Sequence, residues 1–300
     1  MVIFIELCGI IDVGDLMNTN FKKIIDETIQ GYIDAPIDLM NTGDTRNEIK
    51  YIYTCGTSYI RTISDIVSYF HKAGVYDFSR IRVLEIGSFL GIVAVALSRL
   101  GFSVTALDIP EFMANKRIQN KFEQHNIEWY STNLADYLIP CDSAKFDLII
   151  MCEVLEHLNF NPLPVLAEVN RVAVMDGLLY LALPNLTRLR NRMNMLLGWS
   201  IHEPIDSFVH QLNKKDTMIV GIHWREYTVD EVKYMLNKSG FKNVKSYLTS
   251  DAVFFPRRPS LRDLAKKIIF TALPALSFHQ VHIFRKIQRP SDDLLQLLGQ

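Results

Sequence analysis

This 300-residue chain has few cysteines, no net positive charge and no long hydrophobic run, and each of these shortages argues against a class of protein. The four cysteines are Cys8, Cys55, Cys141 and Cys152. They form no Cys-x-x-Cys pair and have no histidine at metal-ligand spacing, which argues against a disulfide framework and favours free thiols in a reducing, cytoplasmic compartment. The formal net charge of -1 lacks the positive footprint of a nucleic-acid binder.

No segment reaches the roughly 20 apolar residues of a membrane-spanning helix. The apolar N-terminal stretch 2–11 contains Glu6 and lacks a basic start, so it is a poor signal peptide. Hydrophobic residues nevertheless make up 49% of the chain, which is enough for a sizeable core and excludes global disorder. We therefore expect a folded chain of one large domain or two small ones.

Beyond residue 80, short apolar runs alternate with helical patterns. This alternation predicts a doubly wound α/β domain with a mostly parallel, seven-stranded sheet. The expected strands are 83–86, 104–108, 127–131, 146–151, 178–183, 244–248 and 280–285. The expected helices are 92–100, 111–125, 164–174 and 229–238. Sheets of this type bind ligands outside the carboxyl ends of their strands.

Other segments flank or interrupt this alternation. Residues 1–80 read as a helical lead segment, with a helix expected at 59–72. The α/β domain then occupies 81–300, with one insertion at 186–223 and a second at 249–278. The first insertion mixes arginines with Met, Leu and Trp at helical spacing. It is expected either to cover the site as a lid or to form a solvated helix face over the core.

The most informative feature is the turn R-V-L-E-I-G-S-F-L-G after the first strand, together with the Asp108 that ends the second strand. Gly87 permits a tight turn and close approach of a ligand, and Gly91 opens a helix with unpaired N–H groups. Because Phe89 stands where a dinucleotide fingerprint needs glycine, that fingerprint fails, and no phosphate-binding Gly-Lys-Ser/Thr follows. Glu85 would repel a pyrophosphate but suits a cationic amino group, and Asp108 can accept ribose hydroxyls. The pattern predicts a ribose-bearing ligand with a positive end and no phosphate.

In the order and spacing of its motifs, the chain resembles the class I S-adenosylmethionine-dependent methyltransferases. The matching segments are V-L-E-I-G-S-F-L-G (83–91), A-L-D (106–108), F-D-L-I-I-M-C-E-V-L-E-H-L (146–158), L-Y-L-A-L-P-N (179–185) and the late helix 223–241. The resemblance implies S-adenosyl-L-methionine as the cofactor and S-adenosyl-L-homocysteine as the product. No metal-binding cluster is evident in the sequence, so we expect no metal. The chain departs from the family at Phe89, where a second glycine is common.

The resemblance also implies roles for individual residues at the cofactor. Those residues are Glu85, Gly87, Ser88 and Gly91 toward the methionine end, Asp108 at the ribose, Ile109, Asn133 and Leu134 at the adenine, and Cys152 and Glu153 beside the methyl group. Asp136 is the alternative to Asn133.

Methyl transfer from a sulfonium is an in-line displacement, in which the enzyme aligns the reactants and excludes water. A hydroxyl acceptor would benefit from a general base, for which histidine is the usual choice near neutral pH. The candidate bases are His157, His202 and His223. The candidate substrate-binding residues are Arg225, Tyr227 and His210. An ordinary ion pair between Arg225 and Glu226 is the alternative for that arginine.

The interpretation we favour is O-methylation of a small molecule or of a saccharide in surface-polysaccharide or secondary-metabolite assembly. The chain has no Asn-Pro-Pro-Tyr or Asp-Pro-Pro-Tyr motif, which argues against amino-group methylation of nucleic acid. The alternatives are a catalytically silent binding or regulatory subunit, an N-methyltransferase and a nicotinamide oxidoreductase. The stretch 256–278 favours a buried connection, with contact to a membrane surface as the alternative, and a homodimer is compatible with the sequence.

Overall fold

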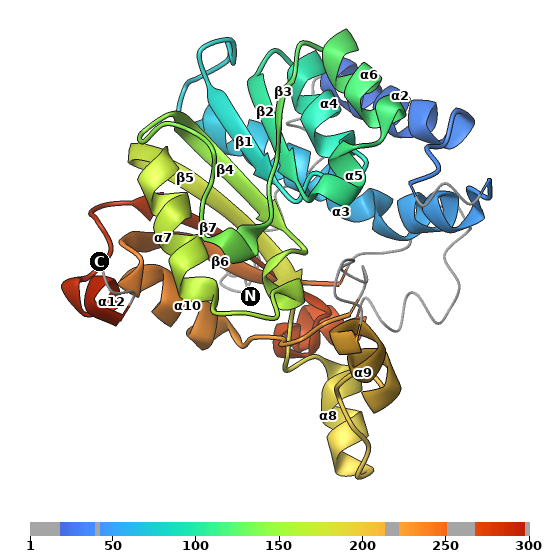
Figure 1. The fold of residues 1–300 in the computed structure, drawn as a ribbon, viewed down its shortest axis with the longest axis vertical. Coiled ribbons are helices and arrows are strands. Elements are labelled where there is room, and N and C mark those ends of the chain that lie inside the picture. The colour runs from blue at the N-terminus through green and yellow to red at the C-terminus, as the bar shows by residue number, and fades with distance from the viewer. Residues whose placement is uncertain (1–18, 40–42, 214–221, 251–267, 298–300) are drawn as a thin grey trace, which may run out of the picture.

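The computed structural model describes residues 19–39, 43–213, 222–250 and 268–297. They form a seven-stranded sheet in the order β3-β2-β1-β4-β5-β7-β6, with helices on both faces (Figure 1). The strands are β1 (Arg82–Ile86), β2 (Ser103–Asp108), β3 (Glu128–Ser131), β4 (Phe146–Cys152), β5 (Ala173–Pro184), β6 (Phe241–Thr249) and β7 (His279–Lys286). Strands β1 to β5 pair in parallel, and β7 runs antiparallel to both of its neighbours. The predicted doubly wound, mostly parallel fold is therefore confirmed.

The two central strands decide where a ligand can bind. Strand β1 pairs with β2 on one side and with β4 on the other, so the strand order reverses between β1 and β4. In open α/β sheets the ligand crevice lies at the carboxyl ends of the strands at such a reversal. Leu84 and Ile150, on these two strands, are both 0% exposed. Helices cover both faces there, which explains the nearly continuous apolar runs in the sequence.

Two helical layers enclose the sheet (Figure 1). One hydrophobic core joins its first face to α2, α4, α5 and α6, and a second core joins the opposite face to α7 and α10. The bounds are α2 (Thr19–Asp34), α3 (Arg46–Lys72), α4 (Ile92–Arg99), α5 (Pro110–Met113), α6 (Lys116–Gln124), α7 (Pro162–Val172), α8 (Leu189–Leu196), α9 (Ile205–Asn213), α10 (Val229–Lys238) and α12 (Asp292–Leu297). Short 3-10 helices lie at η1 (Leu134–Asp136), η2 (Leu155–His157) and η3 (Pro274–Leu276).

Three helix predictions were wrong in their extent. The single helix expected at 111–125 is two helices, because Asn115 adopts an extended conformation and its side chain caps α6 by accepting from the Arg117 N–H. The helix expected at 164–174 begins at Pro162 and ends at Val172, because Asn161 caps its first turn. The helix expected at 59–72 begins already at Arg46, and its apolar side continues upstream through the fully buried Ile52.

Helix α3 lies against the carboxyl edge of the sheet. The Tyr51 ring meets the Phe89 ring at 5.0 Å between centroids, in the turn after β1. Farther along the helix, the Thr62 hydroxyl lies 3.9 Å from the Cys152 sulfur at the end of β4. The N-terminal segment thus packs directly on the ends of the two central strands, where it can close the crevice.

Helices α8 and α9 of the first insertion project from the sheet as an arm, at the bottom of Figure 1. The arm exposes large apolar side chains, which are Met193, Met195, Leu196, Leu197, Trp199 and Ile205. Among the described residues no helix is long and apolar enough to cross a membrane. The stretch 256–267, which includes most of the segment considered for membrane contact, lies outside the described residues.

Candidate functional site

The turn after β1 is held to the end of β2 by a single carboxylate. The backbone N–H of Phe89 donates to Asp108 Oδ2 at 2.6 Å, and that of Ile109 donates to Asp108 Oδ1 at 2.7 Å. Phe89 adopts a left-handed φ of 48°, beside Gly87 at 76° and Gly91 at 80°. Phe89 therefore keeps the backbone conformation that glycine would favour there. Its ring packs at 5.2 Å from the Phe112 ring.

Both glycines of this turn also lie too close to neighbours for a side chain. A Cβ added at Gly87 would meet a methyl of Val154 at 2.3 Å, and one at Gly91 would meet the Phe122 ring at 2.4 Å. The backbone of the turn is thus packed tightly against the loop that follows β4 and against α6. Gly91 is the N-cap of α4, so the unpaired N–H groups of that helix begin at the same turn.

Glu85, at the end of β1, is a buried acid beside this turn. It is 6% exposed, and its Oε2 has no hydrogen-bond partner among the described residues. Burial raises the pKa of Glu85 to about 8; the charge of Asp108 adds to the rise, and a hydrogen bond from the Ala94 backbone opposes it. Burial raises the pKa of the Tyr32 and Tyr59 hydroxyls, and the charge of Glu85 adds to the rise at both. An unpartnered carboxyl in this position fits a ligand that brings a cationic amino group.

Asp108 fits the ribose end of the same ligand. Burial raises its pKa to about 6, against the two backbone hydrogen bonds from Phe89 and Ile109, which lower it. Each carboxylate oxygen accepts one backbone N–H and retains a further lone pair for a hydroxyl donor. Because Ile109 is half-buried beside it, the end of β2 offers both a polar and an apolar surface. The two acids and the tight turn suit S-adenosylmethionine.

The other residues expected at the cofactor lie along the same sheet edge. Asn133 is exposed, and its side-chain oxygen caps η1 by accepting from the Ala135 N–H, while Leu134 is buried. Burial raises the pKa of the Cys152 thiol to about 12, with the charge of Glu153 as the next cause. Glu153 itself has a left-handed φ of 53°, and its Oε1 has no hydrogen-bond partner among the described residues.

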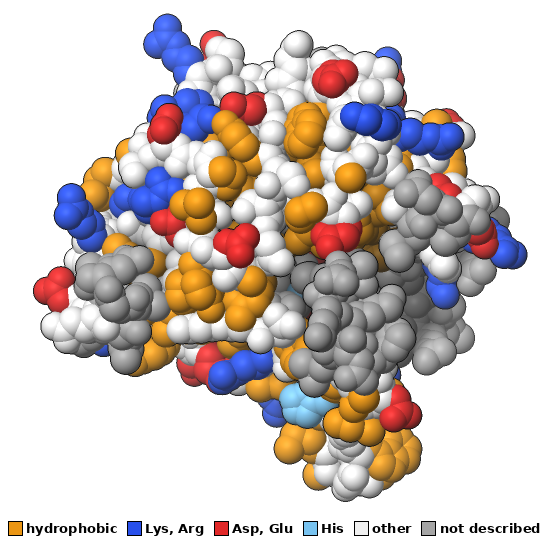
Figure 2. Space-filling model, in the orientation of Figure 1, with side chains coloured by type: hydrophobic (Ala, Val, Ile, Leu, Met, Phe, Trp, Pro, Cys, Tyr) orange, Lys and Arg blue, Asp and Glu red, His pale blue; other side chains and the backbone are white. Residues whose placement is uncertain are grey.

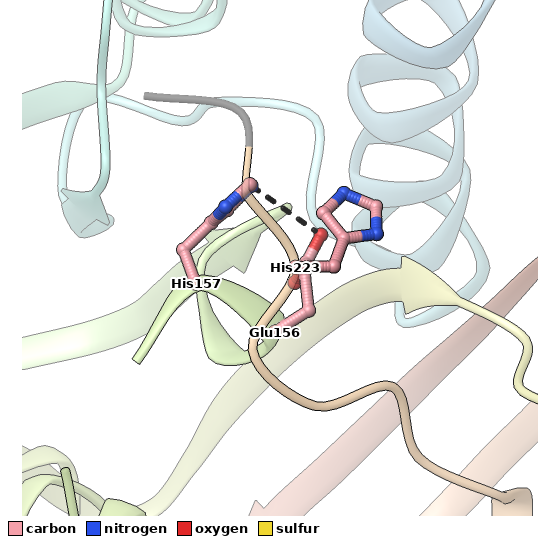
Figure 3. A group of neighbouring side chains, drawn as sticks. All are labelled: Glu156, His157 and His223. Carbon is pink, nitrogen blue, oxygen red and sulfur yellow. Dashed lines mark ion pairs between the residues drawn. The ribbon is translucent and has the colours of Figure 1, made fainter. Parts of the chain in front are cut away.

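Beyond the end of β4, three side chains from two separate segments converge (Figure 3). Glu156, His157 and His223 each place one ligand atom within 4.8 Å of the others. The His157 and His223 rings meet edge to face at 5.0 Å, and the His157 Nε2 lies 3.9 Å from Glu156 Oε1. Burial lowers the pKa of His157 to about 4; the hydrogen bond to the Ile222 carbonyl opposes this, and the charge of His223 adds to it. This imidazole is therefore neutral near pH 7.

Glu156 is 0% exposed, and neither of its carboxyl oxygens has a hydrogen-bond partner among the described residues. Burial raises its pKa well above the ordinary value, and the charge of Glu153 is the next cause. Glu153, which is predicted to lie beside the methyl group, is therefore a close neighbour of this cluster.

A second carboxylate orients His223. The His223 Nδ1 lies 3.0 Å from Glu226 Oε1, which also accepts from Arg188 at 2.7 Å, while Asn191 donates to Oε2 at 2.8 Å. Burial alone would raise the pKa of Glu226, but the hydrogen bond from His223 and the charge of Arg188 hold it below the ordinary value. Arg188, His223 and Glu226 line a hollow of about 30 Å³, together with Ile201 from the connection between α8 and α9.

The predicted base and substrate residues lie in different surroundings in the structure. His157 and His223 come together, whereas His202 is exposed on the far rim of the hollow. The ion pair considered for Arg225 and Glu226 is wrong, because Arg225 pairs with Glu231 at 2.7 Å.

The remaining two substrate candidates are not among the residues that line the hollow. Tyr227 is 3% exposed and belongs to the core that α10 covers, so that only its backbone carbonyl meets a lining residue, by accepting from the Leu186 N–H at 3.1 Å. The side chain of His210 lies outside the described residues.

Sequence reasoning missed Glu156, Glu226 and Arg188. The spacing E-V-L-E-H, which places a second acid directly before His157, was a signal for the first of them. No comparable signal existed for Glu226 and Arg188, because only the folded chain brings the insertion against the end of β4.

Comparison with known proteins identifies the family. A family model described as a methyltransferase domain matches residues 58–246, more than half of the chain. A ubiquinone biosynthesis O-methyltransferase from Maricaulis maris (strain MCS10) is 33% identical over 122 residues, which are 41% of this chain and 48% of that protein. The chain matches about half the length of such curated relatives.

Solved structures support the same fold. An S-adenosylmethionine-dependent methyltransferase from Methanosarcina mazei superposes with a TM-score of 0.50 at 17% identity, covering 74% of this chain and 98% of that one. The magnesium protoporphyrin IX methyltransferase from Synechocystis PCC 6803 with bound SAH gives 0.50 at 14% identity, covering 89% and 99%. At these identities the likeness shows the fold alone. Together with the family match, it places the chain in the methyltransferase domain family, as a class I methyltransferase that uses S-adenosylmethionine.

Proposed function

We propose that this methyltransferase acts on a hydroxyl of a small molecule, with Glu85 and Asp108 holding the cofactor and the Glu156–His157–His223 group facing the acceptor. The observation that carries the proposal is this group: neutral imidazole and buried carboxyl side chains meet at the end of β4, next to Glu153. When bound, S-adenosylmethionine supplies the methyl group from its sulfonium sulfur, and the rest of the cofactor leaves as a neutral thioether. What the protein must add is alignment, exclusion of water and removal of the hydroxyl proton.

Two further observations support an oxygen acceptor. Glu226 holds one nitrogen of His223, which leaves the other nitrogen of that ring available toward the hollow. The curated relatives described above are O-methyltransferases by name. Their match covers about half of their length, so their substrates support the proposal without deciding it.

The arm supports an acceptor with an apolar portion. Ile201 brings the connection between α8 and α9 to the hollow, and the hydrophobic side chains gathered on this arm are visible in Figure 2. Trp199 and Leu196 are 64% and 80% exposed, an arrangement that favours contact with an apolar molecule. A saccharide acceptor, which the sequence also left open, finds less support in this surface.

The test is transfer of labelled methyl from S-adenosylmethionine to matched acceptors: a dihydroxylated aromatic ring with and without an alkyl tail, its amino analogue, and a free sugar. We expect methylation of the hydroxyl compounds, fastest with the tail. His223→Ala should lower kcat by roughly 100-fold or more with the SAH dissociation constant unchanged, while His125→Ala, on a distant turn, should have no effect. Methylation of the amine alone, or an unchanged kcat in His223→Ala, would contradict the proposal.

A further inference from the structure

We propose that Glu156, His157 and His223 form a binding site for a divalent transition-metal ion such as Zn²⁺ or Mn²⁺. Figure 3 shows the three side chains turned toward one another from η2 and from the segment before α10. The His157 Nε2 and Glu156 Oε1 are 3.9 Å apart. Two atoms that each lie about 2.1 Å from one ion can be separated by up to about 4.2 Å, so this spacing admits an ion between them.

The buried carboxyl of Glu156 is the first independent indication. It is 0% exposed, and neither oxygen has a hydrogen-bond partner among the described residues. Burial and the neighbouring Glu153 disfavour a negative charge on this carboxyl, and without a cation it keeps a proton that it can share with Glu153. A cation bound by its oxygens would satisfy the group.

The tautomers of the two histidines are the second indication. His157 Nδ1 lies 2.8 Å from the Ile222 carbonyl, which can only accept, so this nitrogen carries the hydrogen and Nε2 carries a lone pair. His223 Nδ1 donates to Glu226 in the same way. Metal-binding histidines usually donate their second N–H to a backbone carbonyl or to a carboxylate, which fixes the ring and its tautomer. Both arrangements are present here.

The outer contacts also make the site rigid. Glu226, which orients His223, is itself fixed by Arg188 at 2.7 Å and by Asn191 at 2.8 Å. The Glu156 carbonyl accepts from the Trp224 N–H at 2.8 Å, which ties the two metal-binding segments together. A site whose ligands are held by second contacts is prepared to bind an ion without large rearrangement.

The ligand types select the class of metal. Two imidazoles and one carboxylate suit Zn²⁺, Mn²⁺ or Fe²⁺ better than Ca²⁺, which prefers an all-oxygen set. Three protein ligands leave coordination positions open toward the hollow. A catalytic role for the ion rests on the proposed function. An ion at this site would lower the pKa of the acceptor hydroxyl, and the hydroxyl proton would pass to water. The group would then act through the ion rather than through one histidine as a free base.

Metal binding is tested directly on the full chain. After dialysis against a chelator, titration calorimetry with Zn²⁺ or Mn²⁺ should find one ion per chain. Glu156→Gln and His223→Ala should weaken binding by roughly 100-fold or more, and Glu226→Gln by roughly 10- to 100-fold. His125→Ala should bind as the unaltered chain does, which controls for adventitious histidine sites.

Two measurements keep the test independent of misfolding and of activity. Pulsed electron paramagnetic resonance of Mn²⁺ on the unaltered chain should show nitrogen couplings from imidazole ligands. Retained SAH binding should show that the variants are folded. No ion on the unaltered chain, no nitrogen coupling, or equal binding by the folded variants would overturn the site. Metal binding without hydroxyl methylation would sustain the site and refute the proposed function instead. Full methylation by the chelated enzyme would refute only the role of the ion.

Discussion

Replacing Glu85 by glutamine should stabilise the ligand-free protein while weakening cofactor binding. Burial raises the pKa of Glu85 from its ordinary value of 4.5 to about 8. Between pH 4.5 and about 8, Glu85 keeps its proton in the folded chain but has lost it in the unfolded chain. The stability that this group contributes is therefore complete below about pH 4.5 and is lost as the pH rises through 8. Glutamine has no proton to lose and removes this dependence.

The size of the effect follows from the same shift. Each pKa unit corresponds to about 1.4 kcal/mol, so the folded chain loses about 3.5 kcal/mol of stability through Glu85 between pH 5 and pH 8. At roughly 2 °C per kcal/mol for a chain of this length, the difference in Tm between Glu85→Gln and the unaltered chain should grow by about 7 °C over that range.

The assay is thermal unfolding without ligand at several pH values, paired with calorimetry of SAH binding. Glu123→Gln, an exposed acid of α6, is the matched control and should leave the pH dependence unchanged. Loss of a charge-assisted contact to the ligand's amino group should weaken SAH binding roughly 10- to 100-fold. A Tm difference that does not vary with pH would refute the raised pKa. Unchanged affinity would refute the placement of the methionine end at Glu85.

Two other substitutions test the turn. Asp108→Ala removes the acceptor for two backbone N–H groups as well as the proposed ribose contact, so SAH affinity measured by calorimetry should fall by roughly 100-fold or more; a loss under threefold would contradict the assignment. Gly87→Ala and Gly74→Ala share left-handed φ values of 76° and 78°, but only the first would bring a Cβ to 2.3 Å from Val154. Denaturant unfolding should therefore show about 1–2 kcal/mol of destabilisation for Gly74→Ala and roughly 1–3 kcal/mol more for Gly87→Ala, and equal losses would show that the turn is not tightly packed.

The fold class and the cofactor site could be predicted from residue pattern and spacing, because the signals that predict them are local in the sequence. The 27 residues from Arg82 to Asp108 contain an apolar strand, a turn with Gly87 and Gly91, and a second strand that ends in Asp108. Parallel strands end at the same edge of a sheet, so the convergence of Glu85 and Asp108 follows from the fold class. The division into domains, a homodimer and a role for 256–278 remain predictions.

Only the tertiary structure decided what lies around that edge. The conformation of Phe89 depends on the Asp108 carboxylate and on a ring from α3, which no local pattern contains. His223 meets His157 from 66 residues farther along the chain, and Glu226 of the same segment is held by Arg188 of the insertion. Such contacts result from how loops at the end of the sheet fold back over it. The sequence by itself therefore determined the fold and the cofactor, whereas the group expected to face the acceptor was decided by long-range packing.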